Sequence, residues 1–135
     1  QAKVLKKLIK LIPQDVLVLR MAIQSAAFSD DIDFARKSLI LLKKSSQLDP
    51  KSPTSLISLA VAYQFNRDFK NQAIVLKKLI KLIPEDVLVL RMAIQSAAFS
   101  DDIDFATKSL SLIKKYNNRA FNQAYSFLKQ TFPNI

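Results

Sequence analysis

The 135-residue chain contains no cysteine, histidine, glycine or tryptophan. Zinc and copper sites depend on cysteine and histidine ligands, and serine-histidine-aspartate triads and thiol nucleophiles need the same residues. Phosphate-binding loops and dinucleotide-binding turns need glycine where a side chain would block the ligand. We therefore expect a protein that is not an enzyme and has no catalytic, cofactor-binding or metal-binding residues.

Apolar runs long enough to cross a membrane are missing as well. The segment VLVLRMAIQSAAF at 16–28 is interrupted by Arg20 and Gln24. It is also shorter than the roughly 20 residues that a spanning helix requires. The absence of cysteine is compatible with reducing and oxidising compartments alike, so the sequence leaves the localisation open.

The chain is rich in positive charge and in apolar residues. It carries 21 Lys and Arg against 11 Asp and Glu, a formal net charge of +10, and 50% of its residues are hydrophobic. A disordered basic tail has few apolar residues, whereas this composition supports a buried core. The simplest organisation is one elongated domain.

The chain contains one long internal repeat. Residues 1–44 align with 72–115 at a constant offset of 71, and the two segments differ only at positions 3, 14, 36, 40 and 42. Polar positions match as well as apolar ones, although packing constrains mainly the apolar positions. We infer a tandem duplication, either recent or engineered, and a fold that is built from repeated units.

Short polar or proline-containing segments divide the chain into stretches of about 11–17 residues, a length that favours helices over strands. Apolar residues recur within the stretches at helical spacing, as at Leu19, Ala22, Ile23 and Ala26. We predict an all-α fold of about eight helices. Their predicted spans are 2–12, 15–28, 32–46, 54–66, 69–83, 86–99, 103–116 and 119–131. Aspartates at helix starts, where a carboxylate can cap free N–H groups, are Asp15, Asp31, Asp68, Asp86 and Asp102.

The short loops favour antiparallel helix hairpins, and each hairpin needs a neighbour to cover its second apolar face. The middle of the chain, SLISLAVAYQFNRDFKNQAIVLKKLIKLIPED at 55–86, resembles a tetratricopeptide repeat. The residues that match the family pattern are Leu59, Ala60, Ala62, Tyr63, Asp68, Phe69 and Pro84. Pro50 precedes Pro84 by 34 residues, which is the period of the family.

The flanking segments DFARKSL at 33–39 and DFATKSL at 104–110 resemble the same family, with Ala35 and Ala106 as the small residues at the helix crossing. The resemblance implies a right-handed α-solenoid of stacked antiparallel hairpins. Its predicted parts are a half-repeat at 1–13, repeats at 14–50, 51–84 and 85–118, and a C-terminal helix at 119–135. It also implies a concave groove that is lined by the first helix of each repeat and binds protein segments.

The resemblance further indicates which side chains face this groove. Arg20, Gln24 and Phe28 share one side of their helix, at i, i+4 and i+8, and the duplicate repeats them as Arg91, Gln95 and Phe99. The corresponding residues of the middle repeat are Ile57, Val61, Gln64 and Phe65. This pattern predicts two Arg/Gln pairs beside an apolar centre, suited to an extended or helical peptide with acidic groups and a hydrophobic anchor. In the alternative interpretation, Arg20 and Arg91 pair with neighbouring acidic residues and keep a buried helix soluble.

The predicted second helices carry most of the excess positive charge, on the side that the resemblance implies is convex. The lysines concerned are Lys6, Lys7, Lys10, Lys37, Lys43, Lys44, Lys77, Lys78, Lys81, Lys108, Lys114 and Lys115. Such a stripe could bind nucleic-acid phosphates or anionic lipid headgroups. A solvated outer face, with lysine stems that cover apolar surface, is the favoured interpretation.

One acidic segment occurs twice in the chain. The segment SDDID at 29–33 and 100–104 lacks the glycine and the distant glutamate of a calcium loop, so helix capping accounts for it.

The predicted helix 2–12 lacks the hairpin partner that its copy at 73–83 has, and an uncovered apolar face favours binding. Either another repeat precedes it, or a second molecule packs there. The sequence therefore predicts a peptide-binding scaffold. One alternative is a module that self-assembles into a homo-oligomer through its terminal helices. The other is a lysine-rich surface that binds nucleic acid or anionic membranes.

Overall fold

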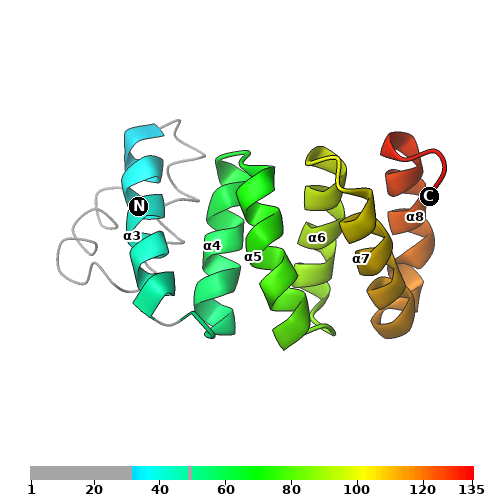
Figure 1. Ribbon diagram of the computed structural model, residues 1–135, viewed down its shortest axis with the longest axis horizontal. Helices are drawn as coiled ribbons and strands as arrows, with labels where there is room; N and C mark the ends of the chain where they lie inside the picture. Colours follow the sequence, from blue (N-terminus) through cyan, green and yellow to red (C-terminus); the bar gives the residue numbers. More distant parts are fainter. Residues whose placement is uncertain (1–31, 49) are drawn as a thin grey trace. The chain divides into compact units, whose positions relative to one another are not determined.

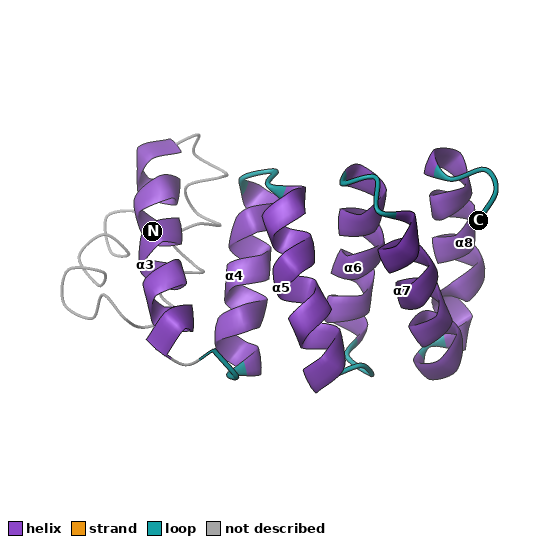
Figure 2. Cartoon of the chain, in the orientation of Figure 1, coloured by secondary structure: helices purple, strands orange, loops and turns teal. Residues whose placement is uncertain are grey.

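The computed structural model of the chain describes residues 32–48 and 50–135, and these residues form helices and turns without a strand (Figures 1 and 2). The helices are α3 (Ile32–Leu48), α4 (Pro53–Phe65), α5 (Phe69–Leu82), α6 (Val87–Phe99), α7 (Ile103–Tyr116), the 3-10 helix η1 (Asn118–Ala120) and α8 (Phe121–Thr131). The all-α prediction is confirmed for this part of the chain. The predicted helices 2–12 and 15–28 lie outside it.

Most predicted helix boundaries agree with the structure to within two residues. The main difference is at the C-terminal end, where the predicted helix 119–131 is divided into η1 and α8. Neither Asn117 before η1 nor Ala120 before α8 makes a side-chain capping hydrogen bond. Without a cap, the first turn tightens into 3-10 geometry, which is common at helix ends.

Polar side chains cap the starts of three helices. Asp86 accepts a hydrogen bond of 3.0 Å from the Val89 N–H at the start of α6, and Asp102 accepts one of 3.0 Å from the Phe105 N–H at the start of α7. The predicted caps Asp86 and Asp102 are therefore confirmed, whereas Asp15 and Asp31 lie outside the described residues. At the start of α4, which sequence reasoning did not assign to a cap, Ser52 accepts from Ser55 N–H at 3.3 Å.

The helices recur with a period of 34 residues. Helices α4 and α6 each have 13 residues and begin 34 positions apart, and α5 and α7 each have 14 residues and begin 34 positions apart. The capping residues Ser52 and Asp86 have the same separation. This period is distinct from the offset of 71 between the near-identical segments.

The turns that follow α4 and α6 have the same backbone geometry. Arg67 and Asp101, again 34 positions apart, adopt left-handed backbone with φ of 55° and 56°. The next residue, Asp68 or Asp102, donates its N–H to the carbonyl of Tyr63 or Ala97 at 2.9 Å in each case. This six-to-one bond is the Schellman arrangement that ends a helix, and its left-handed position is usually occupied by glycine. Because the chain has no glycine, Arg67 and Asp101 take that position.

The chain divides into two compact units, residues 1–68 and 69–135. In the first unit, α3 packs against α4, with Leu42 of α3 fully buried. Eight of the 13 residues of α4 are buried, and these include Leu56, Leu59, Ala60 and Tyr63, the apolar residues that recur at helical spacing. The Lys43 ammonium lies 5.4 Å from the centre of the Tyr63 ring.

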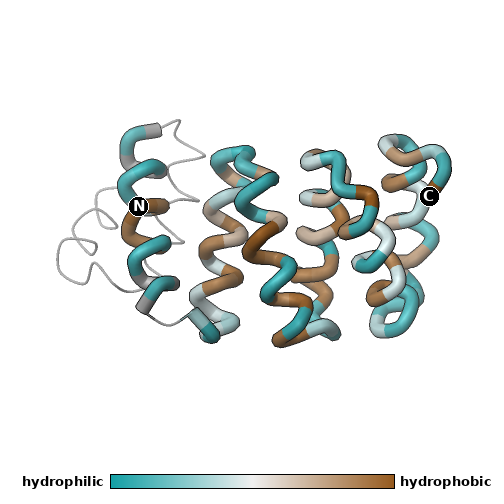
Figure 3. The backbone as a smooth tube through the Cα atoms, in the orientation of Figure 1, coloured by the Kyte–Doolittle hydropathy of each residue, from teal (hydrophilic) through white to brown (hydrophobic). Residues whose placement is uncertain are grey.

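In the second unit, successive helices pack in order, with α5 on α6, α6 on α7 and α7 on α8. Helix α8 also contacts α6, and the two run in the same direction, opposite to α5 and α7 (Figure 1). The side of α6 predicted to face the core is buried, at Leu90, Ala93, Ile94 and Ala97. Along α5 and α7 apolar and polar stretches alternate (Figure 3), as expected for helices with one buried side.

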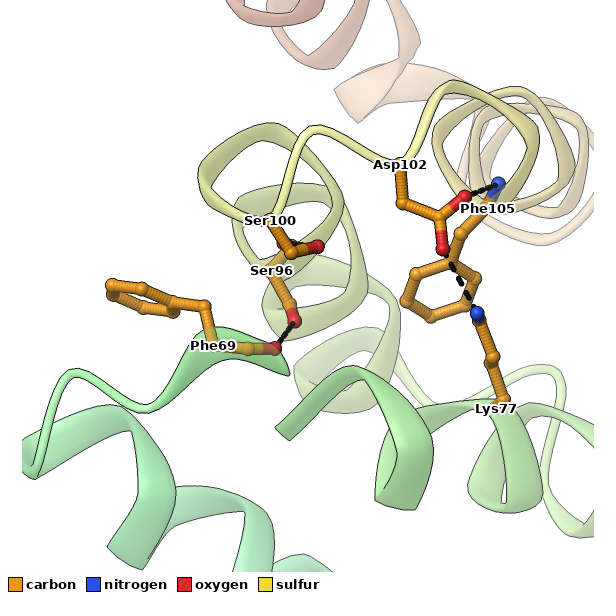
Figure 4. Close-up of polar contacts among 6 residues, drawn as sticks. All are labelled: Phe69, Lys77, Ser96, Ser100, Asp102 and Phe105. Atoms are coloured by element: carbon orange, nitrogen blue, oxygen red, sulfur yellow. Dashed lines mark hydrogen bonds and ion pairs between the residues drawn. The ribbon is translucent and has the colours of Figure 1, made fainter. Parts of the chain in front are cut away.

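Two polar contacts link α5 to α6 and to the start of α7 (Figure 4). The fully buried Ser96 hydroxyl of α6 donates to the Phe69 carbonyl at the start of α5 at 2.9 Å. Lys77 of α5 pairs with the Asp102 carboxylate at 2.8 Å and lies 5.3 Å from the centre of the Phe105 ring. The hydrogen bond from Lys77, together with that from Phe105 N–H, lowers the pKa of Asp102 below its ordinary value.

Candidate functional site

An open groove of about 800 Å³ lies in the second unit. One wall is α6, the other is α8 with the residues just before it, and Ile113 of α7 contributes between them. The lining residues of α6 are Val87, Leu90, Arg91, Ile94 and Gln95, and those of the other wall are Asn117, Ala120, Gln123, Ala124, Ser126, Phe127 and Gln130. The groove therefore has an apolar floor with polar side chains along both walls.

The α6 wall presents one cation and one amide. Arg91 and Gln95 are one helical turn apart and share one side of α6, beside the buried Leu90 and Ile94. The Arg91 side chain is exposed, and no acidic residue forms an ion pair with it in the part of the chain that the structure describes. The alternative interpretation, in which Arg91 pairs with a neighbouring acid, therefore has no support here.

The α8 wall is held by one apolar anchor and presents neutral polar groups. Leu128 is fully buried, and it is the only buried residue of α8. Gln123 and Gln130 are seven positions apart, so they share one side of the helix, and both are exposed. Asn117, at the end of α7, places a third amide on this wall.

An aromatic cluster adjoins the groove. Phe99, the last residue of α6, lies 4.7 Å from Phe69 between ring centres and 6.4 Å from Phe127, which lines the groove. Phe99 is 58% exposed, unusually open for a large apolar side chain. The cluster therefore offers an apolar surface at the end of α6 remote from Arg91.

The electrostatic character of the groove is positive. None of the described residues that line it is acidic, and Arg91 is the single charged residue among them. The last acidic residue in the chain is Asp104, so residues 105–135 contain no Asp or Glu, while their cations are Lys108, Lys114, Lys115, Arg119 and Lys129. A negatively charged ligand group is therefore attracted to the groove and meets no carboxylate there.

The structure brings together the predicted site residues of the second unit. Arg91 and Gln95 line the same groove, and Phe99 is linked to it through Phe127. The predicted residues of α4 lie in the first unit, where Val61 is buried, Ile57 and Gln64 are half-buried and Phe65 is 40% exposed. Arg20, Gln24 and Phe28 lie outside the described residues. The predicted role of these residues in peptide binding stays a prediction.

Sequence reasoning did not identify the α8 wall. It considered the C-terminal helix only as a surface for self-assembly. The available signal was the placement of Gln123 and Gln130 two helical turns apart. That signal is weak, because a polar stripe on a helix is most often simply its solvated side.

The lysine-rich helix surfaces are exposed, as predicted, at Lys77, Lys78 and Lys81 of α5 and at Lys108, Lys114 and Lys115 of α7. Several of these side chains already have partners within the chain. Lys114 lies 5.6 Å from the centre of the Phe121 ring, and Lys115 lies 5.1 Å from that of Tyr116. Lysine stems and heads that lie on aromatic rings in this way cover apolar surface.

Other classes of site find no support in residues 32–48 and 50–135. This part of the chain contains no group of acidic residues that could hold a metal ion. None of its helices combines the length and the apolar character needed to cross a membrane. Comparison of the chain with models of known protein families and with curated proteins finds no match.

Proposed function

We propose that this chain is a non-enzymatic helical-repeat scaffold, similar to tetratricopeptide repeats, that binds a segment of a partner protein in the groove between α6 and α8. The observation that carries the proposal is the groove itself. It is open, has an apolar floor, and is lined by Arg91 and Gln95, the pair that the sequence pattern assigns to ligand binding. Grooves of this type bind peptide segments through side-chain pockets and charge-assisted contacts.

The repeat character of the proposal rests on the 34-residue recurrence. The helix lengths, the N-terminal caps and the left-handed residues Arg67 and Asp101 all recur with this period. The order of packing in the second unit, in which each helix contacts the next along the chain, is the packing expected of stacked hairpins. A solenoid fold for the chain is part of the proposal.

The two alternatives have less support. Stacking of chains through the C-terminal helix needs an apolar outer face, but the exposed residues of α8 are polar: Asn122, Gln123, Ser126, Lys129, Gln130 and Thr131. Binding of single-stranded nucleic acid by the lysines of α5 and α7 is favoured by free cations with exposed aromatic rings between them. Lys77 is already paired with Asp102, and the Phe105 ring beneath it is buried.

The proposal is tested by selection of peptides from a random dodecapeptide display library on the immobilised full-length chain. We expect enriched peptides that contain acidic and aromatic residues. Their binding should fall at least about tenfold in Arg91→Ala, the loss that corresponds to about 1.4 kcal/mol. Lys108→Ala is the matched control, because Lys108 is an exposed cation on α7 that does not line the groove. Enriched peptides that bind Arg91→Ala and the unchanged chain equally would contradict the proposal.

A further inference from the structure

We propose that the groove takes its partner segment in extended conformation, and that it selects an acidic side chain and an aromatic or large apolar side chain that are four residues apart. This inference rests on the proposed function and specifies its ligand. Its basis is the distribution of three kinds of side chain in the second unit: one cation, several neutral amides and one aromatic cluster.

The amides determine the conformation of the ligand. Asn117, Gln123 and Gln130 line the wall that is formed by α8 and the residues just before it. Each amide side chain offers a donor and an acceptor, like the peptide group itself. An extended segment presents unpaired N–H and C=O groups along both of its edges, whereas a helical segment has already satisfied its own backbone. The three amides of this wall therefore favour an extended ligand over a helical one.

The cation and the aromatic cluster determine the spacing. Arg91 and Phe99 are eight residues apart on α6, so their Cα atoms are separated by about 12 Å along the helix axis. An extended chain covers this distance in about four residues, at roughly 3.3 Å each. Side chains at i and i+4 of an extended chain also point to the same face, so both can reach into the groove. A helical ligand would need about seven or eight residues to cover the same distance.

The single cation determines what kind of carboxylate is recognised. In the described lining of the groove, Arg91 is the only charged residue, and one guanidinium can bind one carboxylate through two parallel hydrogen bonds. A chain terminus has no advantage in this arrangement, because the lining provides no second cation. An internal Glu or Asp side chain therefore satisfies the site, and the rest of the segment can continue beyond the groove at either end.

The test uses fluorescein-labelled decapeptides with acetylated and amidated ends, each with one Glu and one Phe in a Ser/Thr background. The distance from Glu to Phe varies from two to eight positions, and fluorescence anisotropy with the full-length chain gives each Kd. We expect the tightest binding at a distance of four. Replacement of Glu by Gln, and N-methylation of alternate backbone amides between Glu and Phe, should each weaken binding about tenfold or more.

The variants Arg91→Ala and Gln123→Ala separate the contributions of the groove, with Lys108→Ala as the control. Arg91→Ala should abolish the preference for Glu over Gln, and Gln123→Ala should reduce the effect of N-methylation. Tightest binding at a distance of seven or eight, or stronger binding by a lactam-bridged helical peptide, would overturn the extended conformation and leave the groove function intact. Absence of binding by every peptide, or binding that no groove variant changes, would overturn both.

Discussion

At the scale of single residues, the absence of glycine has a measurable consequence in the turns. Arg67 and Asp101 occupy left-handed backbone positions that cost a residue with a β-carbon roughly 1–2 kcal/mol. Aspartate tolerates this conformation better than arginine does. Replacement of either residue by glycine removes this cost. Part of the resulting gain in stability is lost, because glycine has more conformational freedom in the unfolded chain.

We therefore expect Arg67→Gly to raise the free energy of unfolding by about 1 kcal/mol and Asp101→Gly by about half as much. Urea unfolding followed by circular dichroism measures both changes. Lys78→Gly, at an exposed position inside α5, is the control and should lower the free energy of unfolding by about 1 kcal/mol. A loss of stability in Arg67→Gly would show that its left-handed backbone carries no strain.

Two fully buried serines give a matched pair of substitutions. The Ser96 hydroxyl donates to the Phe69 carbonyl, whereas the Ser109 hydroxyl has no hydrogen-bond partner. Ser96→Ala should lower the free energy of unfolding by about 1 kcal/mol, because a buried hydrogen bond is lost. Ser109→Ala should be neutral or should raise it by about 1 kcal/mol, because a desolvated hydroxyl is removed. Equal effects in the two variants would show that these hydroxyls do not differ in their bonding.

The Asp102 carboxylate makes part of the stability depend on pH. Its pKa in the folded chain is lowered by the Lys77 hydrogen bond and by the Phe105 N–H, relative to an ordinary value of 3.8. The stabilisation is therefore complete above about pH 4–5 and is lost as the pH falls through the lower, folded-state pKa. Asp102→Asn keeps a capping side chain but removes the charge. The difference in unfolding free energy between the unchanged chain and this variant should be largest near neutral pH and should shrink towards pH 2. A difference that stays constant from pH 7 to pH 2 would contradict this assignment.

At the scale of the helices, α8 depends on few contacts although it forms a wall of the groove. Leu128 is its only fully buried side chain. Leu128→Ala should lower the free energy of unfolding by about 2–4 kcal/mol, and it should weaken peptide binding as the α8 wall becomes disordered. Leu88→Ala, at a side chain of α6 that is 47% exposed, is the control and should change the free energy by less than about 1 kcal/mol. Normal hydrogen-exchange protection of α8 in Leu128→Ala would contradict this dependence.

The helices themselves follow closely from local sequence signals. Helix α7 has the predicted bounds 103–116 because Asp102 caps its start and Asn117 and Asn118 follow its end. Such signals act over a few residues, so one sequence is enough to detect them. The division of the predicted helix 119–131 into η1 and α8 was missed because it depends on a cap that is absent.

The groove could be predicted only in part, for a physical reason. Arg91 and Gln95 were identified because they are one turn apart on a single helix and recur in the duplicated segment. The opposite wall belongs to α8. This helix contacts α6 directly, although α7 lies between them in the sequence. No local spacing encodes a contact between helices that are not consecutive, so Gln123, Phe127 and Gln130 were not assigned to the site.

At the scale of the whole molecule, the net charge of +10 and the absence of acidic residues after Asp104 attract acidic partners. This attraction acts on any anion, so it does not by itself distinguish a peptide groove from a lysine-rich binding surface. The distinction lies in where the ligand makes contact. The groove is lined mainly by α6 and α8, whereas Lys77, Lys78 and Lys81 lie on α5 and Lys108, Lys114 and Lys115 lie on α7.

The most direct measurement is therefore a titration of the isotope-labelled full-length chain with the decapeptide that has Glu and Phe four positions apart, followed by NMR chemical shifts. We expect the largest shift changes at Arg91, Gln95, Gln123 and Phe127, with those of Lys78 and Lys108 nearly unchanged. Saturable changes centred on Lys78 and Lys108, with the groove residues unaffected, would contradict the account.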